Sequence, residues 1–166
     1  MNALDALLSA YASSHDAIRE TLGEIPADWL FWQPAPNMNH PGFLLWHLVR
    51  DEDAVVQGEL LGEQQLWEAG EWDLTFGPRT GGQGTGFSAD DVSRLKFEIS
   101  DLQAYAAAVW AATEGALSEV SVARLEAPIY GRRMLDHLLE GSVGHNWVHL
   151  GEVRALMGLR GWRFRE

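Results

Sequence analysis

Residues 135–156, with the sequence LDHLLEGSVGHNWVHLGEVRAL, carry the pattern that decides the fold. Apolar side chains, with polar ones set among them, recur at intervals of three and four residues, the spacing that lines one face of a helix. Gly158 follows as a stop signal, so we predict a helix over residues 132–157. Polar residues on its inner face should lie where this helix meets its neighbours. The predicted inner face consists of Leu135, Leu138, Ser142, His145, His149, Glu152 and Leu156.

Three more windows repeat this helical period. They are residues 3–22, 41–61 and 89–117. Pro41 suits the first turn of a helix, and Ser88 with Asp91 resembles a capping box. Four helices of this length, without a convincing sheet, predict an all-α fold: a four-helix bundle formed by a single domain over residues 1–166.

The segments between these windows lack a helical period. Residues 63–87 hold many glycines and predict a long loop. We expect its residues 71–87 to be mobile and to cover one end of the bundle as a lid. Residues 119–132 mix apolar residues with proline and glycine, which indicates an irregular crossover without a clear strand pair.

Charge and composition narrow the classes of partner. The 166-residue chain has 12 Lys and Arg against 24 Asp and Glu, a formal net charge of −12, and no cysteine. The lack of cysteine excludes a disulfide framework, a cysteine-ligated metal and a cysteine nucleophile. The acidic balance predicts repulsion from nucleic acid and anionic lipid, and no apolar run approaches the length of a membrane-spanning helix. We therefore expect a cytoplasmic protein with a small-molecule substrate, no nucleic acid and no membrane.

Three histidines are candidate metal ligands. His145 and His149 are four residues apart, so both imidazoles project from nearly the same side of one helix. His47 lies on the predicted inner face of residues 41–61. Three neutral imidazoles suit zinc, nickel, cobalt or ferrous iron and leave at least one position open, as in catalytic sites. The alternative is that these three are ordinary core histidines. For His15 we expect a core role, or a role that supports the ligands, rather than metal ligation.

Two acids and one arginine lie close to these histidines in the sequence. Glu152 follows His149 by three residues. Asp51 follows His47 by four residues. Each acid is a candidate metal ligand, a hydrogen-bond acceptor for an imidazole, or a general base. Arg50 is a candidate contact for a substrate carboxylate or a thiolate, with pairing to a neighbouring acid as the simpler explanation.

Three segments together resemble the DinB-like family of metal-binding four-helix bundles. They are WLFWQPAP at residues 29–36, GFLLWHLVRDED at residues 42–53 and GHNWVHLGEV at residues 144–153. The resemblance implies an up-down-down-up bundle whose metal-binding triad falls on His47, His145 and His149. Relatives include isomerases and transferases that use a low-molecular-weight thiol, and proteins assigned as metal-dependent hydrolases. Membership of such a family fixes a site better than a reaction.

Two hypotheses follow for function. The first is a metal-dependent enzyme that transfers a small thiol onto an electrophile or hydrolyses its substrate. Its triad would hold zinc or nickel, with iron as an alternative, while Asp51 and Glu152 act in catalysis and Arg50 contacts the thiol. The second is a non-catalytic bundle that binds a metal or a small ligand and acts as a dimeric stress-response module. We expect a homodimer. An open coordination position beside a cavity favours the enzyme, and a fourth protein ligand favours the binding module.

Overall fold

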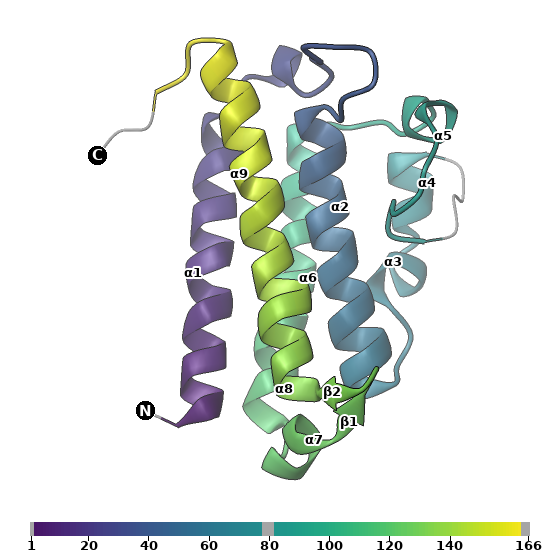
Figure 1. The fold of residues 1–166 in the computed structure, drawn as a ribbon. Helices are drawn as coiled ribbons and strands as arrows, with labels where there is room; N and C mark the ends of the chain where they lie inside the picture. Colours follow the sequence, from purple (N-terminus) through teal and green to yellow (C-terminus); the bar gives the residue numbers. More distant parts are fainter. Residues whose placement is uncertain (1, 78–81, 164–166) are drawn as a thin grey trace.

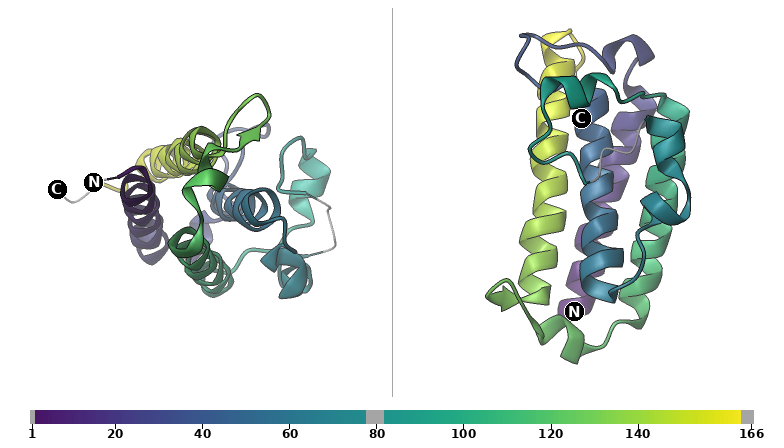
Figure 2. Two further views of the ribbon diagram at one scale, coloured as in Figure 1. Left: turned by 90° about the horizontal axis from the view of Figure 1, so that it is seen from below. Right: turned by 90° about the vertical axis from the view of Figure 1, so that its right-hand side faces the viewer.

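Four long helical segments run up, down, down and up in the computed structural model, which describes residues 2–77 and 82–163 (Figure 1). They are α1 (Ala3–Glu24), α2 (Pro41–Asp53) with its continuation η2 (Ala54–Leu61), α6 (Ile99–Glu119), and the run of α8 (Met134–His137), η3 (Leu138–Val143) and α9 (Gly144–Leu159). Viewed along the bundle, the four segments lie at the corners of a square, with α2 next to both α6 and α9 (Figure 2). The predicted all-α bundle is confirmed.

The predicted helix over residues 41–61 is confirmed as one continuous run, but its second half, η2, has wider turns than an α-helix. His40 caps its start, because Nδ1 of His40 accepts a hydrogen bond from the Phe43 N–H at 3.1 Å. Gly62 ends it in a left-handed conformation with a φ of 72°, which glycine adopts without steric cost. The predicted helix over residues 3–22 is confirmed as α1.

The predicted helix over residues 89–117 is wrong in its first part. The chain forms a short helix, α5 (Ala89–Ser93), and then a non-helical connection before α6 begins. The predicted capping box is confirmed at the start of α5. The helix breaks because Leu95 and Phe97 turn into the core, where both are almost fully buried. Burial of these two side chains outweighs the local helical period.

Short elements occupy the connections that were expected to be irregular. η1 (Ala27–Trp29) lies between α1 and α2, α3 (Leu66–Ala69) and α4 (Trp72–Phe76) follow η2, and α7 (Val122–Glu126) precedes the hairpin of β1 (Pro128–Ile129) and β2 (Arg132–Arg133). The expectation of no strand pair in residues 119–132 is therefore wrong, since strands of two residues are too short to show a period. Residues 78–81 of the expected lid lie outside the described residues, and its mobility stays a prediction.

Two apolar clusters fill the interior, one toward each end of the bundle, and a polar layer separates them. Each of the four long segments contributes a buried polar side chain to this layer. These side chains are His15 of α1, Glu52 of α2, Thr113 of α6 and Asn146 of α9. A buried carboxylate is costly unless it is hydrogen-bonded. The layer therefore has to satisfy Glu52 from several helices at once.

The inner face of α9 is rotated from the predicted one. Its buried residues are Asn146, Leu150, Val153, Leu156 and Met157. The predicted members His145 and His149 are half-buried, and Glu152 is exposed. The wider turns of η3 explain the difference, because they shift the phase of every side chain that follows. Both histidines consequently lie at the edge of α9 that meets α2, outside the apolar interior.

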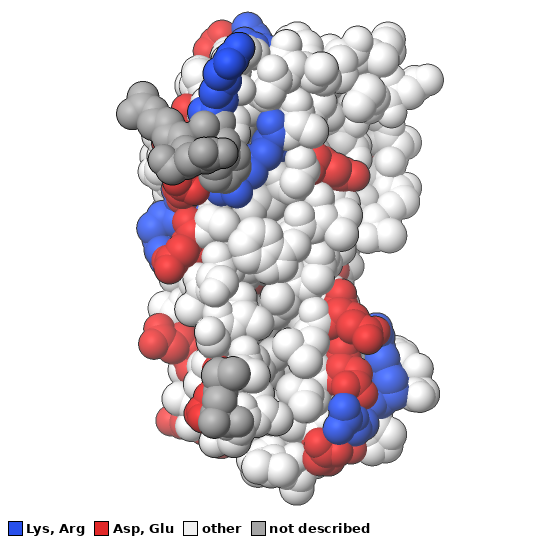
Figure 3. Space-filling model, turned by 60° about the vertical axis from the view of Figure 1, so that its left-hand side comes forward, with Lys and Arg blue, Asp and Glu red and all other residues white. Residues whose placement is uncertain are grey.

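Basic side chains lie among acidic ones on the face shown in Figure 3, and a wide part of that face carries neither. Among the ion pairs of the structure, Arg154 lies 3.0 Å from Glu20 and Arg133 lies 2.6 Å from Asp136. The positive charges of these two arginines are thus neutralised by neighbouring acids. Within residues 2–77 and 82–163, no helix combines the length and apolarity needed to cross a membrane.

Candidate metal centre

The structure brings His47 of α2 together with His145 and His149 of α9. One ligand nitrogen from each residue lies within 4.8 Å of the other two. The ring centroids are 4.8 Å apart for His47 and His145, and 4.4 Å apart for His145 and His149. The three predicted ligands therefore form one cluster that could hold a metal ion.

Helix geometry explains how these side chains meet. Four residues make little more than one turn, so His145 and His149 project from one edge of α9. α2 runs antiparallel to α9 and packs directly against it, which places His47 opposite this pair. Phe43, one turn before His47, stacks on its imidazole with an interplanar angle of 4° and centroids 5.7 Å apart. The Phe43 ring therefore limits the orientations of the His47 imidazole.

Two carboxylates lie beside the α9 histidines. His149 Nδ1 is 2.8 Å from Glu152 Oε2, a hydrogen bond, and His145 Nδ1 is 3.5 Å from Asp51 Oδ2, a longer contact. Burial and two nearby glutamates raise the pKa of Asp51 to about 7. Both acids approach Nδ1, which leaves Nε2 of each imidazole for an ion. This placement favours acceptors that orient the imidazoles over direct metal ligands.

At His47, Nδ1 faces a backbone carbonyl in place of a carboxylate. The Gln83 carbonyl oxygen lies 2.5 Å from His47 Nδ1. A carbonyl oxygen only accepts hydrogen bonds, so His47 carries its proton on Nδ1 and keeps a lone pair on Nε2. Gln83 stands 36 residues from His47 in the glycine-rich segment, and no sequence signal pointed to it.

Burial lowers the pKa of two of the three histidines. The pKa of His145 falls to about 3, because burial penalises the imidazolium and the other two histidines lie close. The pKa of His47 is also lowered by burial, partly offset by its hydrogen bond to the Gln83 carbonyl. Both imidazoles are therefore neutral at pH 7, the state that binds metal.

The cluster contains a mismatch that a cation would remove. Nε2 of His145 lies 3.1 Å from Nε2 of His47. Because His47 holds its proton on Nδ1, a hydrogen bond here requires His145 to be protonated on Nε2. His145 Nδ1 then has no proton, and this buried atom has no hydrogen-bond partner among the described residues. If His47 and His145 held a cation through Nε2, His145 would instead carry its proton on Nδ1, beside Asp51. Ligand nitrogens of a tetrahedral zinc ion lie about 3.3 Å apart, so the residues present fit a metal ion.

In the part of the chain that the structure describes, no fourth His, Asp or Glu joins the cluster. Three nitrogens leave at least one position of a four-coordinate ion for water or another small molecule. A hollow of about 590 Å³ lies between α1 and α6, with His15 and Trp110 in its wall, and the three histidines do not line it. The open position, rather than an adjoining cavity, is therefore the feature that favours an enzyme.

Arg50, the predicted contact for a thiol, is buried in another environment. Its Nη1 lies 3.6 Å from Asp53 Oδ2, and its guanidinium lies 4.9 Å from the ring centroid of Trp67. Asp53 also accepts a hydrogen bond from the Tyr105 hydroxyl at 2.8 Å. These contacts agree with the simpler explanation that Arg50 pairs with a neighbouring acid. They join α2 to α3 and α6.

A buried network next to the triad was missed by the sequence patterns. Glu52 is fully buried, and its carboxylate accepts three hydrogen bonds. The donors are His15 Nε2 at 2.9 Å, Thr113 Oγ1 at 2.8 Å and Asn146 Nδ2 at 2.8 Å. The expected core or supporting role of His15 matches this position. The one available signal was a run of four charged residues, 50–53, between apolar stretches of the predicted helix over residues 41–61.

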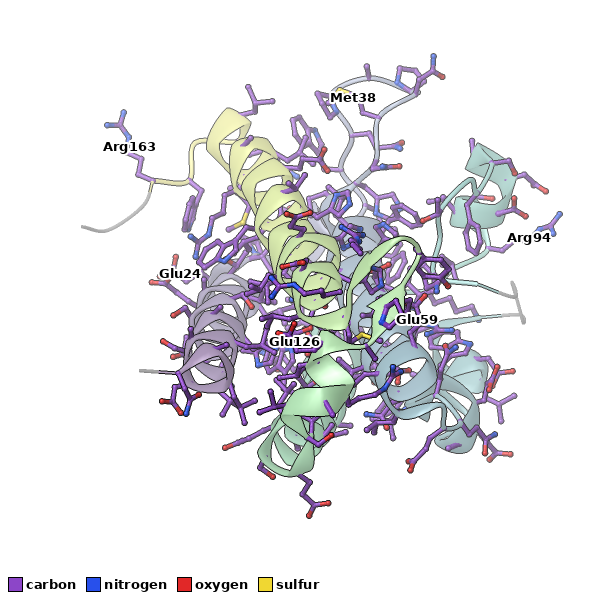
Figure 4. The ribbon with its side chains drawn as sticks, turned by 60° about the horizontal axis from the view of Figure 1, so that its bottom comes forward. Glu24, Met38, Glu59, Arg94, Glu126 and Arg163 are labelled. Carbon is purple, nitrogen blue, oxygen red and sulfur yellow. The ribbon has the colours of Figure 1, made fainter. Side chains whose placement is uncertain are left out.

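His137, a histidine outside the triad, is also buried. Its Nδ1 accepts a hydrogen bond from Arg132 Nη2 at 2.9 Å, so its Nε2 carries the proton and donates to Glu59 at 2.5 Å. The Tyr130 hydroxyl, at the turn of the hairpin, lies 3.2 Å from the same carboxylate. Figure 4 shows Glu59 beside the hairpin. The role of His137 visible here is to join the hairpin to η2.

The fold and the site define a class of protein: an up-down-down-up four-helix bundle whose second and fourth helical segments gather three histidines. The chain belongs to the DinB superfamily, which matches residues 10–153. It is similar to a solved structure of a conserved protein from Enterococcus faecalis, with a TM-score of 0.79 and 19% sequence identity over 94% of this chain and 95% of that one. This likeness shows a shared fold. No match was found among curated proteins.

Proposed function

We propose that this protein is a metal-dependent enzyme whose divalent ion is held by His47, His145 and His149. The observation that most supports this proposal is the 3.1 Å approach of two imidazole Nε2 atoms in a cluster without a fourth ligand among the described residues. A bound ion of this kind lowers the pKa of a coordinated water or thiol and polarises a substrate. Zinc or nickel is the proposed ion, with iron as the alternative, since imidazole suits all three.

The side chains around the triad orient the ligands and accept a proton in this proposal. Glu152 holds the His149 imidazole through Nδ1 and is half exposed, so it is the group best placed to take a proton from a small molecule at the open position. Asp51 lies 3.5 Å from Nδ1 of His145 and is more buried, so it would accept a hydrogen bond from this nitrogen once His145 carries its proton there. Because the chain has no cysteine, thiol transfer requires an external low-molecular-weight thiol. The other proposed reaction is hydrolysis of an ester or amide.

The proposal is tested by metal analysis followed by turnover. Protein purified without a metal-affinity tag is first analysed for bound metals. Metal-loaded protein is then mixed with a panel of small thiols plus an electrophile, and separately with esters and amides. We expect product formation that is lost in His149→Ala and reduced in Glu152→Gln. Glu119→Gln, an exposed change at the end of α6, is the matched control and should leave turnover unchanged.

The alternative is a non-catalytic module that binds a metal or a small ligand, and the hollow between α1 and α6, away from the triad, is the observation that favours it. No turnover across both panels, in protein that binds one ion per chain, would support this alternative. A homodimer and a cytoplasmic location belong to the proposal in either case. Sedimentation of the purified protein tests the homodimer directly.

A further inference from the structure

Gly84 lies in the loop of residues 82–87, which rests on α2 beside the triad. Gly84 is buried, with a φ of 104° in the region that residues with a side chain rarely adopt. A Cβ added there would lie 2.9 Å from Trp46 Cζ3 and 3.0 Å from Phe43 Cζ. Glycine therefore satisfies two separate requirements at this position, the backbone conformation and the close approach to α2.

The residue before Gly84 contacts the site. Gln83 places its carbonyl oxygen at Nδ1 of His47, the contact that leaves Nε2 of His47 as an acceptor. Gly84 and His47 also share a neighbour, because the Phe43 ring that Gly84 approaches is the ring that stacks on the His47 imidazole. The docked loop thus contacts His47 directly through the carbonyl and indirectly through Phe43.

A second anchor holds the loop at its other end. Phe87 packs against Phe43 and Trp46, with ring centroids 6.5 Å and 6.0 Å apart. The Phe87 N–H donates to the Gly84 carbonyl at 3.1 Å, which closes a tight turn between the two anchors. The position of the Gln83 carbonyl is therefore set by packing on α2.

We propose that Gly84 is a positioning residue for the metal centre. By letting the loop dock on Phe43 and Trp46, it keeps the Gln83 carbonyl at Nδ1 of His47 and so directs Nε2 of His47 toward the shared ion. The ion itself rests on the proposed function. The orientation and tautomer of His47 do not, because they are properties of the metal-free chain.

The other residues of the loop supply matched controls. Gly86 also has a positive φ, 79°, but a Cβ added there meets nothing within 4 Å. Gly86→Ala therefore strains the same loop without blocking its contact with α2. Thr85 is exposed, so Thr85→Ala changes the loop surface alone. Comparison of Gly84→Ala with these two variants separates the loss of docking from backbone strain, which Gly86→Ala also causes, and from a change of the loop surface, which Thr85→Ala also causes.

The test has two readouts. The first is the position of the His47 ring proton in metal-free protein, measured by nitrogen NMR at about pH 7.5, above the ordinary pKa of histidine, about 6.5. We expect an Nδ1 proton in wild type and Thr85→Ala, and a proton shared between Nδ1 and Nε2 in Gly84→Ala. The second is the affinity for Zn²⁺ against a competing chelator. We expect Gly84→Ala to weaken it about 10–100-fold, the usual effect of losing a partner that orients a ligand, and Gly86→Ala to weaken it far less.

Each outcome decides the inference. A folded Gly84→Ala variant with the His47 proton still on Nδ1 and an unchanged Zn²⁺ affinity would overturn it. If Gly84→Ala does not fold, Phe87→Ala removes the second anchor and should shift both readouts in the same direction; unchanged readouts there would overturn the inference as well. If wild-type protein binds none of Zn²⁺, Ni²⁺ and Fe²⁺, the proposed function fails, and the His47 proton alone decides the role of Gly84.

Discussion

Nε2 of His47 lies 3.1 Å from Nε2 of His145 across the interface of α2 and α9. The Gln83 carbonyl fixes the proton of His47 on Nδ1, so the lone pair of its Nε2 faces His145. Two imidazole nitrogens at this separation need either a proton or a cation between them. The tautomer of His145 is thereby linked to metal binding: Nε2 carries the proton without an ion, and Nδ1 carries it with one.

Replacing any one of the three histidines with alanine should remove most of the bound metal. The fold should remain, because the two apolar clusters that fill the bundle contain none of these side chains. Metal content per chain and far-ultraviolet circular dichroism measure the two effects. His137→Ala is the control and should keep its metal, since His137 contacts Glu59 and Arg132 instead. Full metal occupancy in all three single variants would rule out the triad.

Glu152→Gln should weaken Zn²⁺ binding about 10–100-fold, the usual effect of losing an acceptor that orients a ligand imidazole. Asp51→Asn should have a smaller effect, because its contact with His145 is 3.5 Å against 2.8 Å for Glu152 and His149. Chelator competition measures both affinities, with Glu119→Gln as the exposed control. If Asp51→Asn abolished binding as completely as His149→Ala, Asp51 would be a direct ligand and the orienting role assigned to it would be wrong.

The sequence predicted the pair of His145 and His149 because the information for this pair is local. The spacing of His145 and His149 decides that they share an edge of a helix, whatever the helix packs against. His47 was added to this pair by its place on the predicted inner face of residues 41–61 and by the resemblance to the DinB-like family. The helical phase was less predictable, since the wider turns of η3 rotate α9 by an amount that no pattern of apolar residues revealed.

Contacts between segments that are far apart in sequence could not be predicted from the sequence patterns. Glu52 lies 37 residues from His15 and 94 from Asn146, and neither separation leaves a periodic signal. The glycine-rich segment was predicted as a loop, which its composition does indicate. Its docking at His47 depends instead on the space above Phe43, a property of the folded bundle.

Glu52→Gln should lower the free energy of unfolding, with little change in overall shape. The carboxylate accepts hydrogen bonds from three side chains, whereas the amide turns an NH₂ group toward some of these donors. Each buried donor left unpaired costs about 1–3 kcal/mol. Urea unfolding of metal-free protein measures the loss, and Glu119→Gln should stay within about 0.5 kcal/mol of wild type. A Glu52→Gln variant as stable as wild type would show that the polar layer contributes little to stability.

The metal-free protein should lose stability through His145 as the pH falls below about 6.5, the pKa of a histidine in an unfolded chain. The pKa of His145 in the folded protein is about 3, so the unfolded state binds more protons between these two values. The free energy of unfolding consequently decreases as the pH falls through this window. His47 acts in the same direction, since its pKa is also lowered. Asp51 acts in the opposite direction: its folded pKa of about 7 lies above the unfolded value, so its burial costs stability as the pH rises toward 7.

Urea unfolding of metal-free wild type, His145→Asn and Asp51→Asn at about pH 7.5 and about pH 5 separates these contributions, because the pH values lie on either side of the unfolded histidine pKa of about 6.5. His145→Asn should lose less stability than wild type on acidification, since it removes a group that only the unfolded state protonates. Asp51→Asn should lose more, since it removes the group that opposes this loss. Metal-loaded wild type should also keep its ion somewhat below pH 6.5, because protons compete for His145 only near its lowered pKa. Identical pH dependence in wild type and His145→Asn would mean that the buried imidazole is not held neutral by its surroundings, and the electrostatic description of the centre would have to be replaced.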